Sequence, residues 1–144
     1  MNLIIDASIL VGELLRRRGR AVLSGPQLNL FITEEQLSEA AYEIARRIDK
    51  IARYGNLTPT EKEELLTEAM SPLTSGIIQA IDRQTYEPSR EIAERRMARD
   101  PNDWAPVALA ITLGADILTN DCDFLGSGCA TWTMDTLRAE LDLA

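Results

Sequence analysis

The sequence predicts an α/β protein, a three-layer α/β/α sandwich around a central parallel sheet of four to five strands. Short apolar runs alternate with longer helical segments along the 144 residues, which is the pattern of parallel strands joined by crossover helices. The runs over residues 3–5 and 117–118 are the clearest of these strands. No repeat, low-complexity segment or linker divides the chain, so we expect residues 1–144 to form a single domain.

The first half of the chain is predicted to contain two extended segments and three helices. Thr33 and Gln36 have the spacing of a capping box, as do Thr60 and Glu63, so a helix should begin at each pair. Ser71-Pro72 should end the later helix, because proline has no N–H to continue it. The expected elements are a strand over 3–5, a helix over 9–18 capped by Ser8, a turn at 24–26, a strand or extended lead-in over 28–32, and helices over 33–54 and 61–70.

The second half is predicted to contain three strands and three helices. Pro88 begins the segment PSREIAERRM, and proline is favoured in the first turn of a helix. The turn cluster at 100–103 leads into a further helix, and Gly114 has the position that ends it. The expected elements are a strand over 77–81, a helix from Pro88, a helix over 104–113, strands over 116–119 and 130–134, and a final helix over 135–143.

The composition excludes several classes of enzyme. The chain has no histidine, which removes Ser-His-Asp and Cys-His catalysis and nearly all catalytic zinc sites. Its only two cysteines, Cys122 and Cys129, cannot build a structural zinc site and are expected to be free thiols. The net charge is −8, so action on a phosphodiester would need bound cations to neutralise the site. Carboxylates are the natural chemistry of such a chain, and they favour Mg²⁺ or Mn²⁺.

Three aspartates stand beyond the C-terminal ends of strands, where parallel sheets bind ligands, and right-handed crossovers are expected to bring a fourth, Asp103, to the same edge. Asp6 ends the first strand, Asp121 and Asp123 follow a later one, and Asp103 begins the helix before that strand. Each has an ordinary alternative: a turn residue for Asp6, a helix N-cap for Asp103 and solvated loop acids for the other two. Asp100, which precedes a proline, is best explained by an Asx turn. Two charges about 4 Å apart repel by about 4 kcal/mol at an effective dielectric of 20, so a cluster of these acids favours a bound cation.

Two stretches of the chain also resemble a known family. The run DPNDWAPVALAITLGADILTNDCDFLGSGCATWTMDTL, with LIIDAS near the N-terminus, resembles the PIN-domain nucleases, which include the VapC-type toxins of toxin–antitoxin pairs. The family pattern is an Asp ending the first strand, a Glu on the second helix, an Asp opening a later helix, and T-x-D-x-D-F after the fourth strand. The resemblance implies a parallel sheet between helices and metal-dependent cleavage of RNA. It also implies a homodimer and, for a toxin, an antitoxin protein that blocks the site.

The resemblance assigns a role to each matching residue. Asp6 corresponds to the first metal ligand, Asp103 to the third acid and Asp121 to the fourth, while Asp123 adds a fifth carboxylate, directly or through water. The implied site therefore consists of the catalytic and metal-binding residues Asp6, Glu39, Asp103 and Asp121, the further metal ligand Asp123, and the substrate-binding hydroxyls of Ser8 and Thr119.

The helix carboxylate has two candidates. The family spacing favours Glu39, six residues after Thr33. At 100° per residue, Glu39 lies about 200° around the helix from Leu37, which belongs to the apolar stripe. Glu39 would therefore be solvated, unless the buried face is wider and includes Ala40. Glu43 lies nearer the stripe, but it has a surface role available as the i,i+4 partner of Arg47. Glu39 is therefore the predicted ligand and Glu43 the reserve.

Two basic clusters and one acidic segment leave open how RNA or a partner would bind. The basic clusters are either solvated surface or phosphate contacts. The segment 56–76 adds a Glu-rich helix, either a solvated cover or a docking element for a partner. The clusters consist of Arg16, Arg17, Arg18 and Arg20 after the first helix, and of Arg46, Arg47, Lys50 and Arg53 on the long helix.

Two rival functions share this fold class. A catalytically silent PIN-fold binding or regulatory module would keep the acids without cleaving RNA. An acidic, magnesium-binding phosphotransfer receiver would need a lysine at the end of a late strand, whereas Lys50 and Lys62 both fall on predicted helices. No run of 18 apolar residues occurs, and no basic region precedes the short apolar stretch MNLII, so we expect a cytoplasmic protein without a membrane span.

Overall fold

The computed structural model describes residues 1–143 and contains one five-stranded sheet in which all neighbouring strands are parallel. The strand order is β3-β2-β1-β4-β5. The α/β class and the sheet of four to five strands are thus confirmed, and each strand falls on a segment predicted to be extended. The strands are β1 (Asn2–Ile5), β2 (Asn29–Thr33), β3 (Ile78–Ile81), β4 (Asp116–Leu118) and β5 (Thr131–Trp132).

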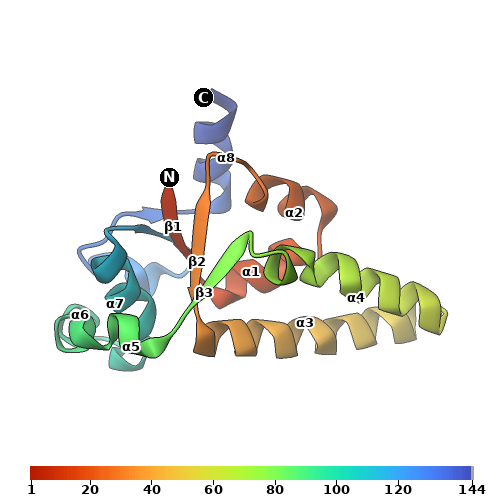
Figure 1. Ribbon diagram of the computed structural model, residues 1–144, viewed down its shortest axis with the longest axis horizontal. Helices are drawn as coiled ribbons and strands as arrows, with labels where there is room; N and C mark the ends of the chain where they lie inside the picture. The colour runs from red at the N-terminus through yellow and green to blue at the C-terminus, as the bar shows by residue number, and fades with distance from the viewer. Residues whose placement is uncertain (144) are drawn as a thin grey trace.

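Helices pack on both faces of the sheet and form the outer two layers (Figure 1). Side chains alternate along β1, so Leu3 and Ile5 point into one apolar core and Ile4 into the other, all without solvent exposure. The first core is covered by α1 (Ala7–Leu14), α2 (Arg17–Leu23), α3 (Glu34–Tyr54), α4 (Pro59–Thr74) and α8 (Met134–Leu143). The second core is covered by α5 (Arg83–Tyr86), α6 (Arg90–Arg96) and α7 (Trp104–Leu113).

The helix predicted over 9–18 is wrong in its extent. The structure has two helices, α1 and α2, separated at Arg16, whose backbone is extended. The break lets Leu23 reach the core, and the Arg20 guanidinium donates to the free carbonyl of Leu14 at 2.7 Å. Asp6 rather than Ser8 occupies the N-cap position of α1, although its side chain makes no capping hydrogen bond.

The long helix α3 is confirmed at both ends. The Thr33 hydroxyl accepts from the Gln36 N–H at 3.2 Å, and Gly55 caps the C-terminal end. The buried face is formed by Ala40, Ile44 and Ile48. This face includes Ala40, which the narrower predicted stripe left out, and the neighbouring Glu39 lines a pocket together with Ala7 and Ser8 of α1.

The helix predicted over 61–70 is longer than expected. Its capping box is made by Thr58 and Glu61 rather than by Thr60 and Glu63. Pro72 does not end α4, because proline in the last turn removes only the hydrogen bond to one preceding carbonyl. The short helix α5, capped by the Asp82 side chain, was not predicted.

The segment before the site matches its prediction closely. A 3₁₀ turn, η1 (Glu87–Ser89), contains Pro88 and leads into α6. The turn cluster forms a second 3₁₀ turn, η2 (Pro101–Asp103), in which the Asp100 carboxylate accepts from the Asn102 N–H, as expected of an Asx turn. The next helix, α7, spans Trp104–Leu113 and ends at Gly114 with a φ of 61°. Only glycine adopts this left-handed conformation without strain.

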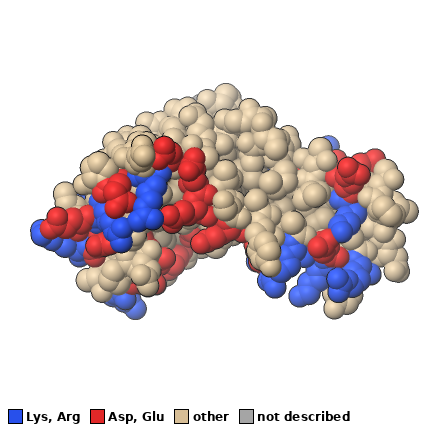
Figure 2. Space-filling view, turned by 60° about the horizontal axis from the view of Figure 1, so that its bottom comes forward, with Lys and Arg blue, Asp and Glu red and all other residues tan. Residues whose placement is uncertain are grey.

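The molecule is hollowed between two parts (Figure 2). On one side lies the part that carries α5, α6 and α7, and on the other the arm formed by α3 and α4. Acidic side chains gather along the first side of the hollow, and basic side chains gather on the arm.

Candidate carboxylate metal site

Asp6 lies at the C-terminal end of β1 and is held there by two hydroxyl groups. The Thr119 hydroxyl donates to Asp6 Oδ2 at 2.9 Å, and the Ser8 hydroxyl donates to the same oxygen at 3.0 Å. Asp6 is only 9% exposed. Because both donors use Oδ2, the carboxylate is fixed in orientation while Oδ1 makes no hydrogen bond among the described residues.

Thr119 connects Asp6 to the loop that follows β4. Its Oγ1 accepts from the Asp121 N–H at 2.9 Å while its hydrogen points to Asp6. Asp121 Oδ1 in turn accepts from the Asp123 N–H at 2.9 Å, which begins the 3₁₀ turn η3 (Cys122–Phe124). A single chain of hydrogen bonds therefore positions the predicted acids of β1 and the later loop. Cys122 and Cys129 are free thiols, as predicted.

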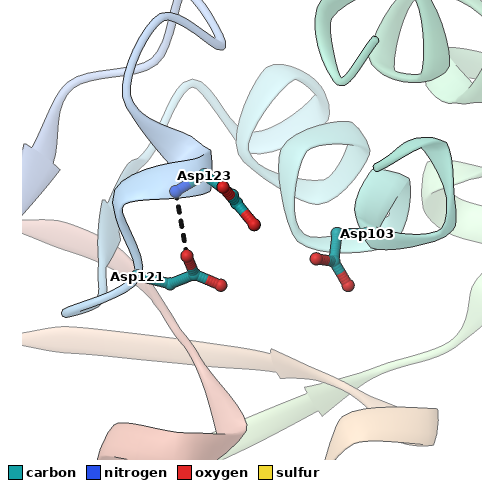
Figure 3. Close-up of side chains that lie close together, drawn as sticks. All are labelled: Asp103, Asp121 and Asp123. Carbon is teal, nitrogen blue, oxygen red and sulfur yellow. Dashed lines mark hydrogen bonds between the residues drawn. The ribbon is translucent and has the colours of Figure 1, made fainter. Parts of the chain in front are cut away.

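Three carboxylates lie close together at the C-terminal edge of the sheet (Figure 3). Asp121 and Asp123 come from the loop after β4, and Asp103 comes from the end of η2, where α7 begins. One carboxylate oxygen from each residue lies within 4.8 Å of the others. Asp103 is at the N-cap position of α7 but makes no side-chain capping hydrogen bond, so the ordinary N-cap explanation does not account for its carboxylate.

The cluster has an unbalanced negative charge. Burial raises the pKa of Asp103, and the negative charges of Asp100, Asp121 and Asp6 raise it further. Asp6 is joined to the loop of Asp121 through Thr119, whose hydroxyl donates to Asp6 and accepts from the Asp121 N–H. Among the residues that the structure describes, the only ion pair of the three clustered carboxylates joins Asp123 to Arg99 at 3.9 Å, and Arg99 is 86% exposed.

The donor set fits a hard divalent cation. It consists of carboxylate oxygens, which are the ligands that Mg²⁺ and Mn²⁺ prefer, and the described chain brings no nitrogen or thiolate ligand into the group. A cation would also offset the repulsion that raises the pKa of Asp103. Asp103, Asp121 and Asp123 are the clustered residues that could hold it, and the role of Asp6 as a further ligand stays a prediction.

The structure separates the two candidates for the helix carboxylate. Glu43 accepts from Arg46 at 2.9 and 3.1 Å and from Arg47 at 3.2 Å, and these bonds lower its pKa. Its carboxylate therefore has the surface role considered above. Glu39 is exposed on α3 and lines the same pocket as Ser8, which is bonded to Asp6. It is not one of the three clustered carboxylates, so its role as a ligand stays a prediction.

Sequence reasoning did not identify every residue that shapes the site. Trp104 is buried at the start of α7 between Tyr86 and the guanidinium groups of Arg83 and Arg90. Arg99 approaches the cluster from the segment after α6. The position of Trp104 directly after an acid was visible in the sequence, but its partners lie 14 or more residues away and come together only on folding.

The repulsion in the cluster leads to a stability prediction. Asp103→Asn is expected to raise the melting temperature of the metal-free protein at neutral pH, because asparagine has the same shape without the charge. The raised pKa means that Asp103 favours the folded state when protonated, and this contribution is lost as pH rises through its folded-state pKa. Melting in EDTA at several pH values tests this. The difference should shrink as pH falls toward about 4, and a less stable variant at neutral pH would contradict it.

The fold and the carboxylates define a class of α/β protein with an acidic site at the C-terminal edge of a parallel sheet. A family model described as "PIN domain" matches residues 4–142, so the chain belongs to the PIN domain family, as the resemblance predicted. The PIN fold is a nuclease fold, and its members generally use divalent metals. No curated protein matches the chain. Within residues 1–143, no helix combines the length and apolar character that a membrane span requires.

Proposed function

We propose that the chain is a metal-dependent endoribonuclease that hydrolyses RNA phosphodiester bonds at the carboxylate cluster. The observation that carries this proposal is the meeting of Asp103, Asp121 and Asp123 from two separate elements, close to the buried and oriented Asp6. Charges this close repel one another, and a bound cation would offset that repulsion.

The proposed ligands are Asp6, Asp103, Asp121 and Glu39, with Asp123 binding directly or through water. Bound Mg²⁺ or Mn²⁺ would supply a Lewis acid for the phosphoryl oxygens and would lower the pKa of a coordinated water. The chain's own contribution is to orient the ligands: Ser8 and Thr119 hold Asp6 Oδ2, and Thr119 and Asp121 hold the loop after β4. No side-chain nucleophile is required, which agrees with the absence of histidine.

Metal binding and cleavage are tested separately. Titration with MnCl₂ or MgCl₂ should raise the melting temperature, because a ligand at 100 times its dissociation constant adds about 2.7 kcal/mol. NaCl at matched ionic strength is the control and should have a much smaller effect. Single-stranded RNA should then be cleaved with the metal and left intact when EDTA is added. Stabilisation without cleavage would favour the catalytically silent module. If the metal neither stabilises the protein nor supports cleavage, the proposed metal site is wrong.

A phosphotransfer receiver is disfavoured by the positions of the lysines. Lys50 lies on α3 and Lys62 on α4, where Lys62 forms an ion pair with Asp49. Neither lies at the end of a strand. Transfer of a phosphoryl group from a small phosphodonor to the protein, followed by mass spectrometry, would separate this function from RNA cleavage.

A role as the toxin of a toxin–antitoxin pair is part of the same proposal and rests on the resemblance to VapC-type proteins. This role predicts that the protein is cytoplasmic, that it forms a homodimer and that it binds an antitoxin which covers the carboxylates. Sedimentation of the purified protein measures the oligomeric state. A short neighbouring gene whose DNA-binding product blocks cleavage would support the toxin role. The absence of any such inhibitor would contradict the toxin role but not the nuclease activity.

A further inference from the structure

A pocket of about 370 Å³ opens between α1 and α3, beside the carboxylates. Its volume lies within the ordinary range of small-molecule sites. Ala7, Val11 and Ala40 form an apolar floor, and Ser8 connects the pocket to Asp6 through its hydrogen bond at 3.0 Å. A group bound here would therefore lie beside Ser8, which is bonded to Asp6, and beside Glu39, two of the residues of the proposed site.

Tyr42 forms one wall of this pocket and is unusually exposed for a large aromatic residue. Its side chain is 73% exposed, although it stands on the middle of α3 rather than at a chain end. Packing in the fold does not account for an aromatic ring at this place. An aromatic face beside an apolar floor is suited to stacking a planar ring, and a nucleobase is the planar group that RNA would present.

The pocket continues along α3 into a basic surface. A second pocket, of about 450 Å³, shares Glu43 and Arg47 with the first and is also lined by Arg46, Asp49, Lys50 and Arg53, so four cationic side chains stand against two carboxylates. Glu43 holds the guanidinium groups of Arg46 and Arg47 in place, while Lys50 and Arg53 make no ion pair among residues 1–143. Figure 2 shows basic side chains on this arm, across the hollow from the acidic side. Positive charge at this position attracts the phosphates that flank a bound base.

We propose that the pocket between α1 and α3 is a base-binding subsite in which Tyr42 stacks on one unpaired nucleobase of the RNA, next to the phosphate that is cleaved. Arg47, Lys50 and Arg53 bind the phosphates that continue along α3. This inference rests on the proposed function and adds to it the residue that makes cleavage depend on an unpaired base. A docking protein is less well matched, because the apolar floor is small and the adjoining surface is strongly charged.

The experiment combines a protein change with a change in the RNA. Wild type, Tyr42→Ala and Tyr42→Phe are compared on a single-stranded RNA and on versions in which an abasic residue is moved through the positions around the cleavage site. Tyr42→Ala should lower kcat/KM by about 5- to 150-fold, the range that stacking one base on an aromatic ring is worth. Tyr42→Phe should retain the activity. Tyr54→Ala is the matched control, because Tyr54 is 80% exposed at the end of the same helix and lines neither pocket.

The decisive result is non-additivity. At one position of the RNA, removing the base should lower kcat/KM of the wild type as much as Tyr42→Ala does on the intact RNA. The Tyr42→Ala variant should have the same kcat/KM on the intact RNA and on this abasic RNA. Equal activity of Tyr42→Ala and wild type, or full additivity at every position, would overturn the subsite while leaving the nuclease in place. A change in sedimentation of Tyr42→Ala without a change in cleavage would also overturn it and assign Tyr42 to a contact between copies.

Binding distinguishes failure of the subsite from failure of the proposed function. Fluorescence anisotropy in EDTA measures the affinity of the intact and abasic RNA for wild type and Tyr42→Ala without any cleavage. The same non-additive loss should appear in the dissociation constants. If the wild type cleaves no RNA, this binding pattern still supports the subsite, and equal binding of both RNAs by both proteins rejects it.

Salt dependence tests the basic part of the proposal. Each phosphate contact on a single strand contributes about 0.7 to the slope of log K against log salt concentration. Lys50→Ala and Arg53→Ala should each reduce that slope by about this amount. Arg95→Ala on α6 is the control, because Arg95 is also exposed to solvent but lines neither pocket. An unchanged slope in both α3 variants would contradict phosphate binding by Lys50 and Arg53.

Discussion

Asp6→Asn is expected to reduce RNA cleavage by about a hundredfold or more while leaving the fold intact. The asparagine side chain has the same shape, and its oxygen can still accept from the hydroxyls of Ser8 and Thr119, which now donate to Asp6 Oδ2. What is lost is the negative charge at the centre of the proposed ligand set. Loss of one oriented electrostatic contact in an active site commonly costs a factor of about 10²–10³ in rate.

The cleavage assay for Asp6→Asn needs a control at the opposite edge of the sheet. Asp116 begins β4 and accepts one hydrogen bond from Trp132 Nε1 at 2.8 Å, so Asp116→Asn makes the same chemical change away from the cluster. This control should cleave RNA like the wild type, and circular dichroism should show both variants folded. Cleavage by Asp6→Asn at the wild-type rate would mean that the site has been misassigned.

Trp104→Ala is expected to destabilise the protein by about 3–5 kcal/mol, the usual cost of truncating a buried tryptophan. The side chain is 8% exposed and packs against the Tyr86 ring, with 5.7 Å between ring centroids. The guanidinium groups of Arg90 and Arg83 lie over the indole at 4.6 and 5.3 Å from its centroid. These contacts hold the start of α7, and Asp103 is the residue directly before Trp104.

Urea unfolding followed by circular dichroism measures this loss, with Trp104→Phe as the control that keeps an aromatic ring in the same place. The phenylalanine variant should lose markedly less stability than the alanine variant. Because Trp104 anchors the helix that carries Asp103 into the cluster, Trp104→Ala should also weaken stabilisation by Mn²⁺ in the folded protein. A loss below about 1 kcal/mol would show that the indole packing contributes little to the fold.

The large elements were predictable because their signals are local. The apolar runs that became β1 and β4 needed no knowledge of the rest of the chain, and Thr33 and Gly114 mark the ends of their helices by short-range hydrogen bonding and backbone conformation. The start of α4 was misplaced for a local reason, because Thr58 with Glu61 and Thr60 with Glu63 both have the spacing of a capping box. The break in the first predicted helix instead depends on packing that the sequence pattern does not show. The break at Arg16 is stabilised by Arg20 bonding to Leu14 and by burial of Leu23, and neither contact has a signature in the sequence.

The sequence alone determined the chemistry available to this protein. A chain without histidine and with only two cysteines has carboxylates as its main metal ligands, and the order of strands and helices places the strand ends that carry aspartates on one edge of a sheet. The tertiary structure alone decided which acids meet, that Glu43 is paired with arginines while Glu39 lines the same pocket as Ser8, and that Tyr42 stands exposed in the lining of that pocket. The physical reason is that a side chain's type follows from the sequence, whereas its neighbours, burial and electrostatic field depend on how separate elements pack.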